Sequence, residues 1–265
     1  MNRTESQERL RIASWGFERI AEAVSGRLDG AEGAPTALST DTRTIEEGEL
    51  FVALRGENFD GHEFVADAAR KGACAAIVER DWEPAEPAEE SLPLIRVDES
   101  REALGALGHA IWSEATDEGL HTVAVTGSNG KTTTKELLRA VWSTLGPTYA
   151  TPGNLNNAIG LPLTLCAIPA QTEHLIVEMG ANAPGEISEL IRMAPGGERI
   201  VTSIGRAHTE GFGSIEGVRA AKSEIFEAAG EGTTAIVPHA ERDELDLAGF
   251  DGEVRSFGPE PGADL

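Results

Sequence analysis

The chain has 265 residues, of which 40% are hydrophobic, and carries 22 basic against 45 acidic residues. At roughly 150 residues per domain this length predicts about two domains, and the apolar content excludes a wholly disordered chain. A formal net charge of −23 opposes binding to a phosphate backbone, so we expect no nucleic acid partner. The polar amino terminus and the lack of an apolar run of roughly eighteen residues predict no signal peptide, no membrane span and a cytoplasmic location.

Residues 1–98 have the pattern of a small α/β domain. Apolar runs at 50–54 and 75–78 alternate with glycine-containing turns and with a helix-like stretch at 63–71. Apolar residues at helical spacing over 100–111 then predict the first helix of a second domain. We therefore expect one domain over 1–98 and another over 99–265.

The second domain alternates strands with helices. Strands are predicted at 121–126, 174–180, 198–205 and 233–238, and helices at 131–146, 184–194 and 214–230. Continuous apolar strands separated by helices predict a doubly wound, mostly parallel sheet that is covered on both faces. Ligands of such sheets bind at the carboxyl ends of the strands, which points to the loops after Thr126, Glu178 and Ile204.

A phosphate-binding loop is predicted where the strand 121–126 meets the next helix. Its residues are Gly127, Ser128, Asn129, Gly130, Lys131, Thr132 and Thr133. Backbone N–H groups of 127–132 can converge on an anion at the start of the helix, where Lys131 would contact the β- and γ-phosphates and the Thr132 hydroxyl would bind Mg²⁺. The pattern is the shorter GxxGKT form and not the full Walker motif. The alternative is a glycine-rich turn with a surface lysine.

Three further side chains are candidates for the same site. Glu178 ends a predicted strand and is the best Mg²⁺ ligand, the alternative being a surface glutamate at a strand end. His208 lies in a loop after the next strand, as a metal or phosphate ligand or as a solvated ring. The spacing on its predicted helix makes Lys222 a surface lysine, whereas the scarcity of lysine, four in the chain, points to a chemical purpose.

Three asparagines, Asn154, Asn156 and Asn157, cluster between glycine and proline residues. Clustered amides suit recognition of a polar substrate or nucleotide. Asx-turns explain the same composition from local chemistry alone. The spacing does not decide between the two.

Six segments resemble the Mur ligase family. STDTR and GELFVALRGENFDGHEFVADAARKGA resemble its uridine-nucleotide-binding amino-terminal domain, and TGSNGKTTTKE resembles its ATP loop. Three more resemble the family members that add D-alanyl-D-alanine: GNLNNAIGLPLTL, VEMGANAPGEI and IGRAHTEGFGSIEGVRAAKSEIF. The resemblance covers nearly the whole chain.

The resemblance implies an ATP-dependent ligase of peptidoglycan precursor synthesis, with UDP-N-acetylmuramoyl-tripeptide and D-alanyl-D-alanine as partners and an acyl phosphate as intermediate. It makes Lys131, Glu178, His208 and Lys222 catalytic and implies Mg²⁺ held by Thr132, Glu178, His208 and Lys222. It further implies that Ser39, Thr40, Asp41 and Arg43 face the uridine nucleotide, that the three asparagines contact substrate or nucleotide, and that the protein is a monomer.

Lys222 matches the lysine that is carbamylated in this family. Carbamylation needs the neutral amine, which is only about 0.1% of an unperturbed lysine near neutral pH. Burial or a nearby positive charge must therefore lower the pKa of Lys222, or metal binding must trap the product.

Relative to the family, we expect the third, carboxyl-terminal domain to be missing and the central sheet to be incomplete. The main alternative is therefore a non-catalytic binding module that keeps the sites without turnover. Another Mur-type amino-acid ligase is the remaining alternative.

Overall fold

The computed structural model describes residues 9–56, 59–84, 92–205, 212–230 and 232–265. These residues form two compact units. The first runs to Ile111 and includes Leu165–Ala170, and the second comprises Trp112–Thr164 and Gln171–Leu265. Helix α3 (Ser100–Asp117) contains the division and extends six residues beyond the helix predicted from the sequence.

The first unit is built on a five-stranded sheet. The strand order is β1-β7-β6-β3-β2, and only β1 is antiparallel to its neighbour among these strands. The strands are β1 (Arg27–Asp29), β2 (Leu38–Ser39), β3 (Leu50–Val52), β6 (Ala75–Glu79) and β7 (Leu94–Val97), with a hairpin of β4 (Arg55–Gly56) and β5 (Phe59–Asp60). The helices are η1 (Arg11–Ser14), α1 (Phe17–Ala23), η2 (Gly61–Phe64) and α2 (Val65–Arg70).

One face of this sheet packs against helix α2, which follows the hairpin. Phe51 of β3 and Ala76 and Val78 of β6 are fully buried in one cluster with Val65 and Ala68 of α2. The alternating positions of the two strands thus supply the core that the short apolar runs predict.

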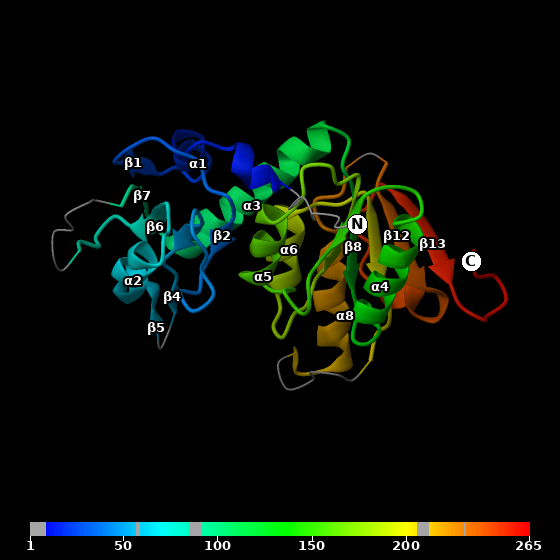
Figure 1. Ribbon diagram of the computed structural model, residues 1–265. Coiled ribbons are helices and arrows are strands. Elements are labelled where there is room, and N and C mark those ends of the chain that lie inside the picture. Colours follow the sequence, from blue (N-terminus) through cyan, green and yellow to red (C-terminus); the bar gives the residue numbers. More distant parts are fainter. Residues whose placement is uncertain (1–8, 57–58, 85–91, 206–211, 231) are drawn as a thin grey trace. The chain divides into compact units, whose positions relative to one another are not determined.

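The second unit is a parallel sheet with helices (Figure 1). The strand order is β13-β12-β11-β8-β10-β9, and every neighbouring pair is parallel. The strands are β8 (His121–Thr126), β9 (Thr148–Ala150), β10 (His174–Glu178), β11 (Glu198–Val201), β12 (Thr234–Pro238) and β13 (Glu253–Phe257). The helices are α4 (Lys131–Trp142), α5 (Gly160–Cys166), α6 (Glu186–Met193), α8 (Ile215–Ser223), η3 (Glu224–Phe226) and η4 (His239–Glu244).

Strand β8 is the point at which the winding of this sheet reverses. From β8 the chain goes to the far strand β9, returns through β10, and then continues on the other side of β8 with β11. Helix α4 packs on β8, β9 and β10, where Leu138 and Trp142 cover Val123 and Val125. In open α/β sheets the carboxyl ends of strands at such a reversal form the ligand crevice, which is where the loop 127–130 lies.

The predicted fold class is confirmed in both units, but several details differ. Strands β9 and β13 were not anticipated, because each has polar or small residues between its apolar ones. Helix α4 ends at Trp142, and the helix that carries Lys222 tightens into a 3-10 turn after Ser223. No helix in the described part of the chain is long and apolar enough to cross a membrane.

Candidate nucleotide and metal site

Two glycines shape the loop between β8 and α4. Gly127 has φ +144°, and a Cβ atom there would lie 2.1 Å from Oγ1 of Thr202 at the end of β11. Gly130 is the N-cap of α4 with φ +83° and, as glycine, brings no side chain to cap the helix. The first-turn N–H groups of α4 therefore remain directed at an external acceptor, as anion-binding helix ends require.

The expected convergence of all six N–H groups of 127–132 is wrong for two of them. The Ser128 N–H donates to Ser203 O at 2.8 Å, and the Asn129 N–H donates to Ser203 Oγ at 3.0 Å. The Thr202 hydroxyl in turn donates to Asn129 O at 2.6 Å. Half of the loop is thus fastened to the residues after β11, because the two segments lie against each other at the same edge of the sheet. The anion cradle is confined to the helix end.

Lys131 and Thr132 begin α4 and both face the carboxyl end of the sheet. The Lys131 Nζ donates to Gly127 O at 2.8 Å, and burial lowers the pKa of Lys131 against a smaller opposing effect of Glu178. The Thr132 hydroxyl donates to Glu178 Oε2 at 2.9 Å. Thr133, the next residue of the helix, is exposed. Lys131 is thus half-buried and hydrogen-bonded within its own loop, which disagrees with the alternative of a surface lysine.

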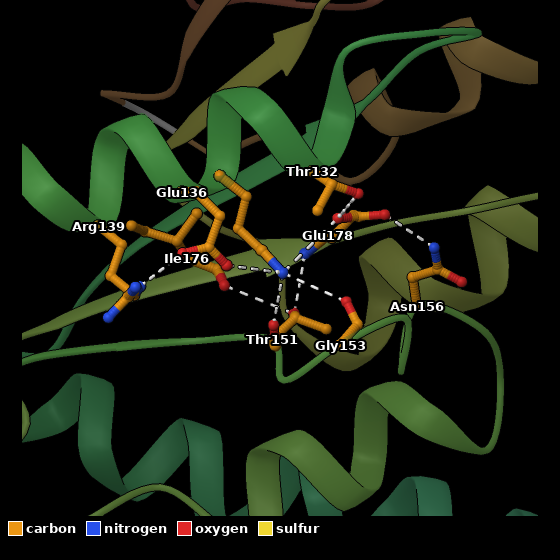
Figure 2. A network of polar contacts seen from close by, with 9 residues as sticks. Thr132, Glu136, Arg139, Thr151, Gly153, Asn156, Ile176 and Glu178 are labelled. Atoms are coloured by element: carbon orange, nitrogen blue, oxygen red, sulfur yellow. Dashed lines mark hydrogen bonds and ion pairs between the residues drawn. The ribbon is translucent and has the colours of Figure 1, made fainter.

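Glu178 is the centre of this site. The residue is 2% exposed at the carboxyl end of β10, so the alternative of a surface glutamate is wrong. Oε1 accepts from Asn156 Nδ2 at 2.9 Å while Oε2 accepts from Thr132, and Figure 2 shows both partners directed at the carboxylate. Gly180 permits the approach of Asn156, because a Cβ there would lie 2.9 Å from the Asn156 amide.

The donor chemistry around Glu178 suits a hard divalent cation. A carboxylate, a hydroxyl and an amide carbonyl are oxygen ligands of the kind that Mg²⁺ prefers, whereas thiols are not among them. Among the described residues no group of three or more His, Cys, Asp and Glu side chains is placed to hold a metal ion. His208 lies outside the described residues. A metal here would therefore rest on Glu178, Thr132 and the oxygen atoms of a bound nucleotide.

The three asparagines have different surroundings. Asn156 points at Glu178, as described. Asn157 Oδ1 accepts from the backbone N–H groups of Ile159 and Gly160 at 3.2 and 2.8 Å, which is the local turn chemistry of a helix start before α5. Asn154 is exposed, and its carbonyl accepts from the Asn156 N–H at 2.8 Å.

Lys222 is buried, with 3% of its surface exposed, so its expected surface position is wrong. Helix α8 begins at the predicted cap Ser214, and the ring of Phe212 lies 5.5 Å from the Lys222 Nζ. Burial, helped by the positive charge of Lys131 and opposed by Glu224 and Glu186, lowers the pKa of Lys222 to about 8. The spacing did not reveal this burial because it describes one helix alone and carries no information about Phe212, whose ring lies beside the ammonium.

The sequence analysis missed Lys135, which lies one turn after Lys131 on α4. It is 1% exposed, and its Nζ donates to Thr151 O at 2.8 Å and to Gly153 O at 3.3 Å. The same Nζ lies 3.9 Å from Glu178 Oε2. Two signals could have found it: lysine is scarce in this chain, and Lys135 lies three and seven residues before Leu138 and Trp142, on the face of α4 that packs on the sheet.

In the first unit, the STDTR residues border a cavity of about 480 Å³. It is lined by Thr40, Asp41, Thr42, Arg43, Phe51, Phe59 and Phe64. The Arg43 guanidinium holds Asp41 through two nitrogens, Nε at 2.9 Å and Nη2 at 2.6 Å, and lowers the pKa of Asp41 to about 2. Ser39 shapes the turn, since its Oγ accepts from the Asp41 N–H at 3.2 Å.

Two aromatic residues of this cavity were not predicted. Phe59 of β5 and Phe64 of η2 are both exposed, and their rings stack with centroids 5.4 Å apart. Exposed stacked rings beside an arginine suit a planar base with attached phosphates. The signal in the sequence is two phenylalanines in a glycine-rich turn, where no core would need them.

The comparison with protein-family models matches both parts of the chain. Residues 125–264 match the Mur ligase middle domain, and residues 35–112 match the model described as Mur ligase family, catalytic domain. The chain belongs to the Mur ligase family. It therefore contains the amino-terminal and middle domains of a Mur ligase.

Similar proteins with curated names are D-alanyl-D-alanine-adding members. The UDP-N-acetylmuramoyl-tripeptide--D-alanyl-D-alanine ligase of Bacillus subtilis is 42% identical over 79% of this chain and 45% of its own length. The Escherichia coli protein of the same name is 39% identical over 83% of this chain and 47% of its own length. The chain thus spans about half the length of the curated relatives it matches.

Solved structures of MurF ligases are also similar to this chain. A crystal structure of MurF from Acinetobacter baumannii matches with a TM-score of 0.83 and 34% identity, over 94% of this chain and 54% of that one. The MurF ligase of Thermotoga maritima in complex with ADP matches with a TM-score of 0.73 and 32% identity, over 84% of this chain and 50% of that one.

Proposed function

We propose that this chain is the uridine-nucleotide- and ATP-binding part of a ligase that joins D-alanyl-D-alanine to UDP-N-acetylmuramoyl-tripeptide. The observation that carries the proposal is the glycine loop at the start of α4 with Lys131 and Thr132 directed at buried Glu178, in a chain 42% identical to a ligase of that name. The reaction belongs to peptidoglycan precursor synthesis in the cytoplasm, and we propose that the chain acts as a monomer.

The proposed reaction has two steps. A carboxylate oxygen of the tripeptide attacks the γ-phosphorus of ATP, which forms an acyl phosphate and releases ADP. The amine of D-alanyl-D-alanine then attacks the acyl carbon through a tetrahedral intermediate. The new C–N bond forms, inorganic phosphate leaves with the C–O electron pair, and the amine loses a proton to solvent.

Lys131 and the loop would bind the transferring phosphoryl group. The Lys131 ammonium now donates to the Gly127 carbonyl, and a phosphate oxygen would replace that neutral acceptor with a charged one. The N–H groups at the start of α4 would receive the neighbouring oxygens, with Gly127, Ser128, Asn129, Gly130 and Thr133 completing the loop. Thr132 and Glu178 would hold Mg²⁺, which neutralises charge on the phosphoryl oxygens when bound.

Lys222 and His208 complete the proposed catalytic set. With a pKa of about 8, about a tenth of the Lys222 side chains are neutral at pH 7, against about 0.04% for an unperturbed lysine. Burial and the charge of Lys131 thus meet the condition that carbamylation imposes. A carbamate would give this buried helix position a negative charge for a second Mg²⁺.

The substrate contacts are proposed from the same geometry. In the first unit, Thr40, Asp41 and Arg43 line a cavity whose exposed aromatic rings could hold the uracil base, and Ser39 shapes their turn. In the second unit, Asn156 lies at the metal candidate, whereas Asn154 and Asn157 belong to the turn that presents it. We propose substrate or nucleotide contacts for all three asparagines.

Phosphate release tests the proposal. The chain, given UDP-N-acetylmuramoyl-tripeptide, D-alanyl-D-alanine, ATP and Mg²⁺, should release phosphate only when both amide partners are present. Lys131→Ala should abolish this release and leave uridine-nucleotide binding unchanged.

The second candidate is a binding module without turnover. Binding of both nucleotides without phosphate release would establish it. Turnover that persists in Lys131→Ala would overturn our assignment of the ATP loop.

A further inference from the structure

The buried ammonium of Lys135 is joined to three parts of the proposed nucleotide site. It sits on α4, one turn after Lys131, and donates to the carbonyls of Thr151 and Gly153 in the loop after β9. It also lies 3.9 Å from Glu178 Oε2 at the end of β10. Figure 2 shows this polar network, in which Thr151 and Gly153 lie on one side and Glu178 lies on the other.

A buried ammonium needs charge compensation. The two carbonyls are neutral, and Glu136, 3.3 Å away, is exposed, so solvent screens its charge. Glu178 is the buried carboxylate within 4 Å, and its own hydrogen-bond donors, Thr132 and Asn156, are neutral. Lys135 and Glu178 therefore compensate each other.

The loop that Lys135 holds also fixes Glu178. The Thr151 hydroxyl accepts from the Glu178 N–H at 2.9 Å, and the Thr151 carbonyl accepts from Lys135 at 2.8 Å. The same loop leads through Gly153 to Asn156, whose amide donates to Oε1 of Glu178. Without the ammonium, the buried Thr151 carbonyl would lose its donor, the Gly153 carbonyl would lose a weaker one, and the loop would lose its tie to α4.

We propose that Lys135 is a positioning residue that acts through Glu178. It holds the carboxylate and the 151–156 loop in the arrangement that receives a metal–nucleotide complex, and it sets how strongly Mg²⁺ promotes nucleotide binding. It is not itself a ligand. The inference rests on the proposed function, because it takes Glu178 to be a metal ligand beside the ATP loop.

The test is a thermodynamic cycle on the whole chain, with ADP affinity measured by calorimetry in Mg²⁺ and in EDTA. We expect Mg²⁺ to strengthen ADP binding roughly tenfold or more in the unaltered chain and less than about twofold in Lys135→Met. Affinity in EDTA should change by less than about twofold, because Lys131 and the loop remain. A purely structural role would weaken binding equally in both buffers and would overturn the inference.

Three further variants make the result specific. Glu178→Gln should also remove the Mg²⁺ effect, and adding Lys135→Met to it should cause no further loss, since the two residues act as one unit. Glu136→Gln, at the exposed neighbour, should keep the full Mg²⁺ effect. Lys135→Gln, which keeps N–H donors for the carbonyls, replaces the methionine variant if that one does not fold, with the same expected loss.

The outcome is separable from that of the proposed function. A chain that binds ADP with Mg²⁺ dependence but releases no phosphate overturns the ligase proposal. The effect of Lys135→Met on the Mg²⁺ dependence can still be measured in such a chain. An unaltered chain whose ADP affinity is equal in Mg²⁺ and EDTA overturns the inference about Lys135. The inference is also overturned if the losses of ADP affinity from Lys135→Met and Glu178→Gln add fully in the double variant.

Discussion

Replacing Lys222 with methionine should make the chain more stable at neutral pH, and the gain should fade as the pH rises. Burial, with the charge of Lys131, lowers the pKa of Lys222 from 10.5 to about 8. Below pH 8 the side chain is charged in both the folded and the unfolded chain, and burying that charge lowers the free energy of unfolding. Between pH 8 and 10.5 the folded chain releases the proton first, so the free energy of unfolding rises with pH.

The size of this effect follows from the pKa difference. The difference corresponds to about 3 kcal/mol in total, of which about 2 kcal/mol falls between pH 7 and 9.5. Methionine has nearly the same length and no charge, so packing differences add only a constant offset. The advantage of Lys222→Met over the unaltered chain should therefore shrink by about 2 kcal/mol across that interval.

Urea unfolding in carbon dioxide-free buffer, from pH 7 to 9.5, measures this difference. Lys71→Met, which removes an ammonium with a 43% exposed side chain in the first unit, controls for the loss of one positive charge from an acidic chain. Lys131→Met should move the pH window of Lys222 upward, because the charge of Lys131 contributes to the lowered pKa. A stability difference between Lys222→Met and the unaltered chain that stays constant with pH would refute the reasoning.

Two more changes test the loop and the sheet. Gly127→Ala should weaken ADP binding by more than about tenfold, because its Cβ would clash with Thr202 and its backbone strain costs about 1–3 kcal/mol. Gly119→Ala, with φ +100° but open space around it, should bear only the strain and keep ADP affinity in calorimetry. The buried Arg199 guanidinium donates to the backbone carbonyls of Gly196, Ile225, Glu227 and Ala228. Arg199→Met should lower the free energy of unfolding in urea by about 3 kcal/mol, and Arg192→Met, at an exposed ion pair, by less than about 1 kcal/mol. Equal losses within either pair would contradict these predictions.

The sequence by itself determined the α/β class and the place of the glycine loop that we propose binds the nucleotide. Both follow from local patterns: continuous apolar strands alternate with helices, and the glycines and Lys131 follow β8 directly. The end of β10 could likewise be read from three apolar residues followed by Glu178. These features need no knowledge of which segments meet in space.

Only the tertiary structure decided which side chains work together. Lys222 has the spacing of a surface residue on its helix, yet it is buried and its ammonium lies 5.5 Å from the ring of Phe212. Lys135 lies on the sheet-facing side of α4, but only the structure shows that Thr151, Gly153 and Glu178 surround its ammonium. Asn156 and Asn157 are neighbours with equal propensities, but one reaches Glu178 and the other starts α5. Burial and partners depend on segments distant in sequence, and the period of a single helix or turn carries no information about what packs across from it.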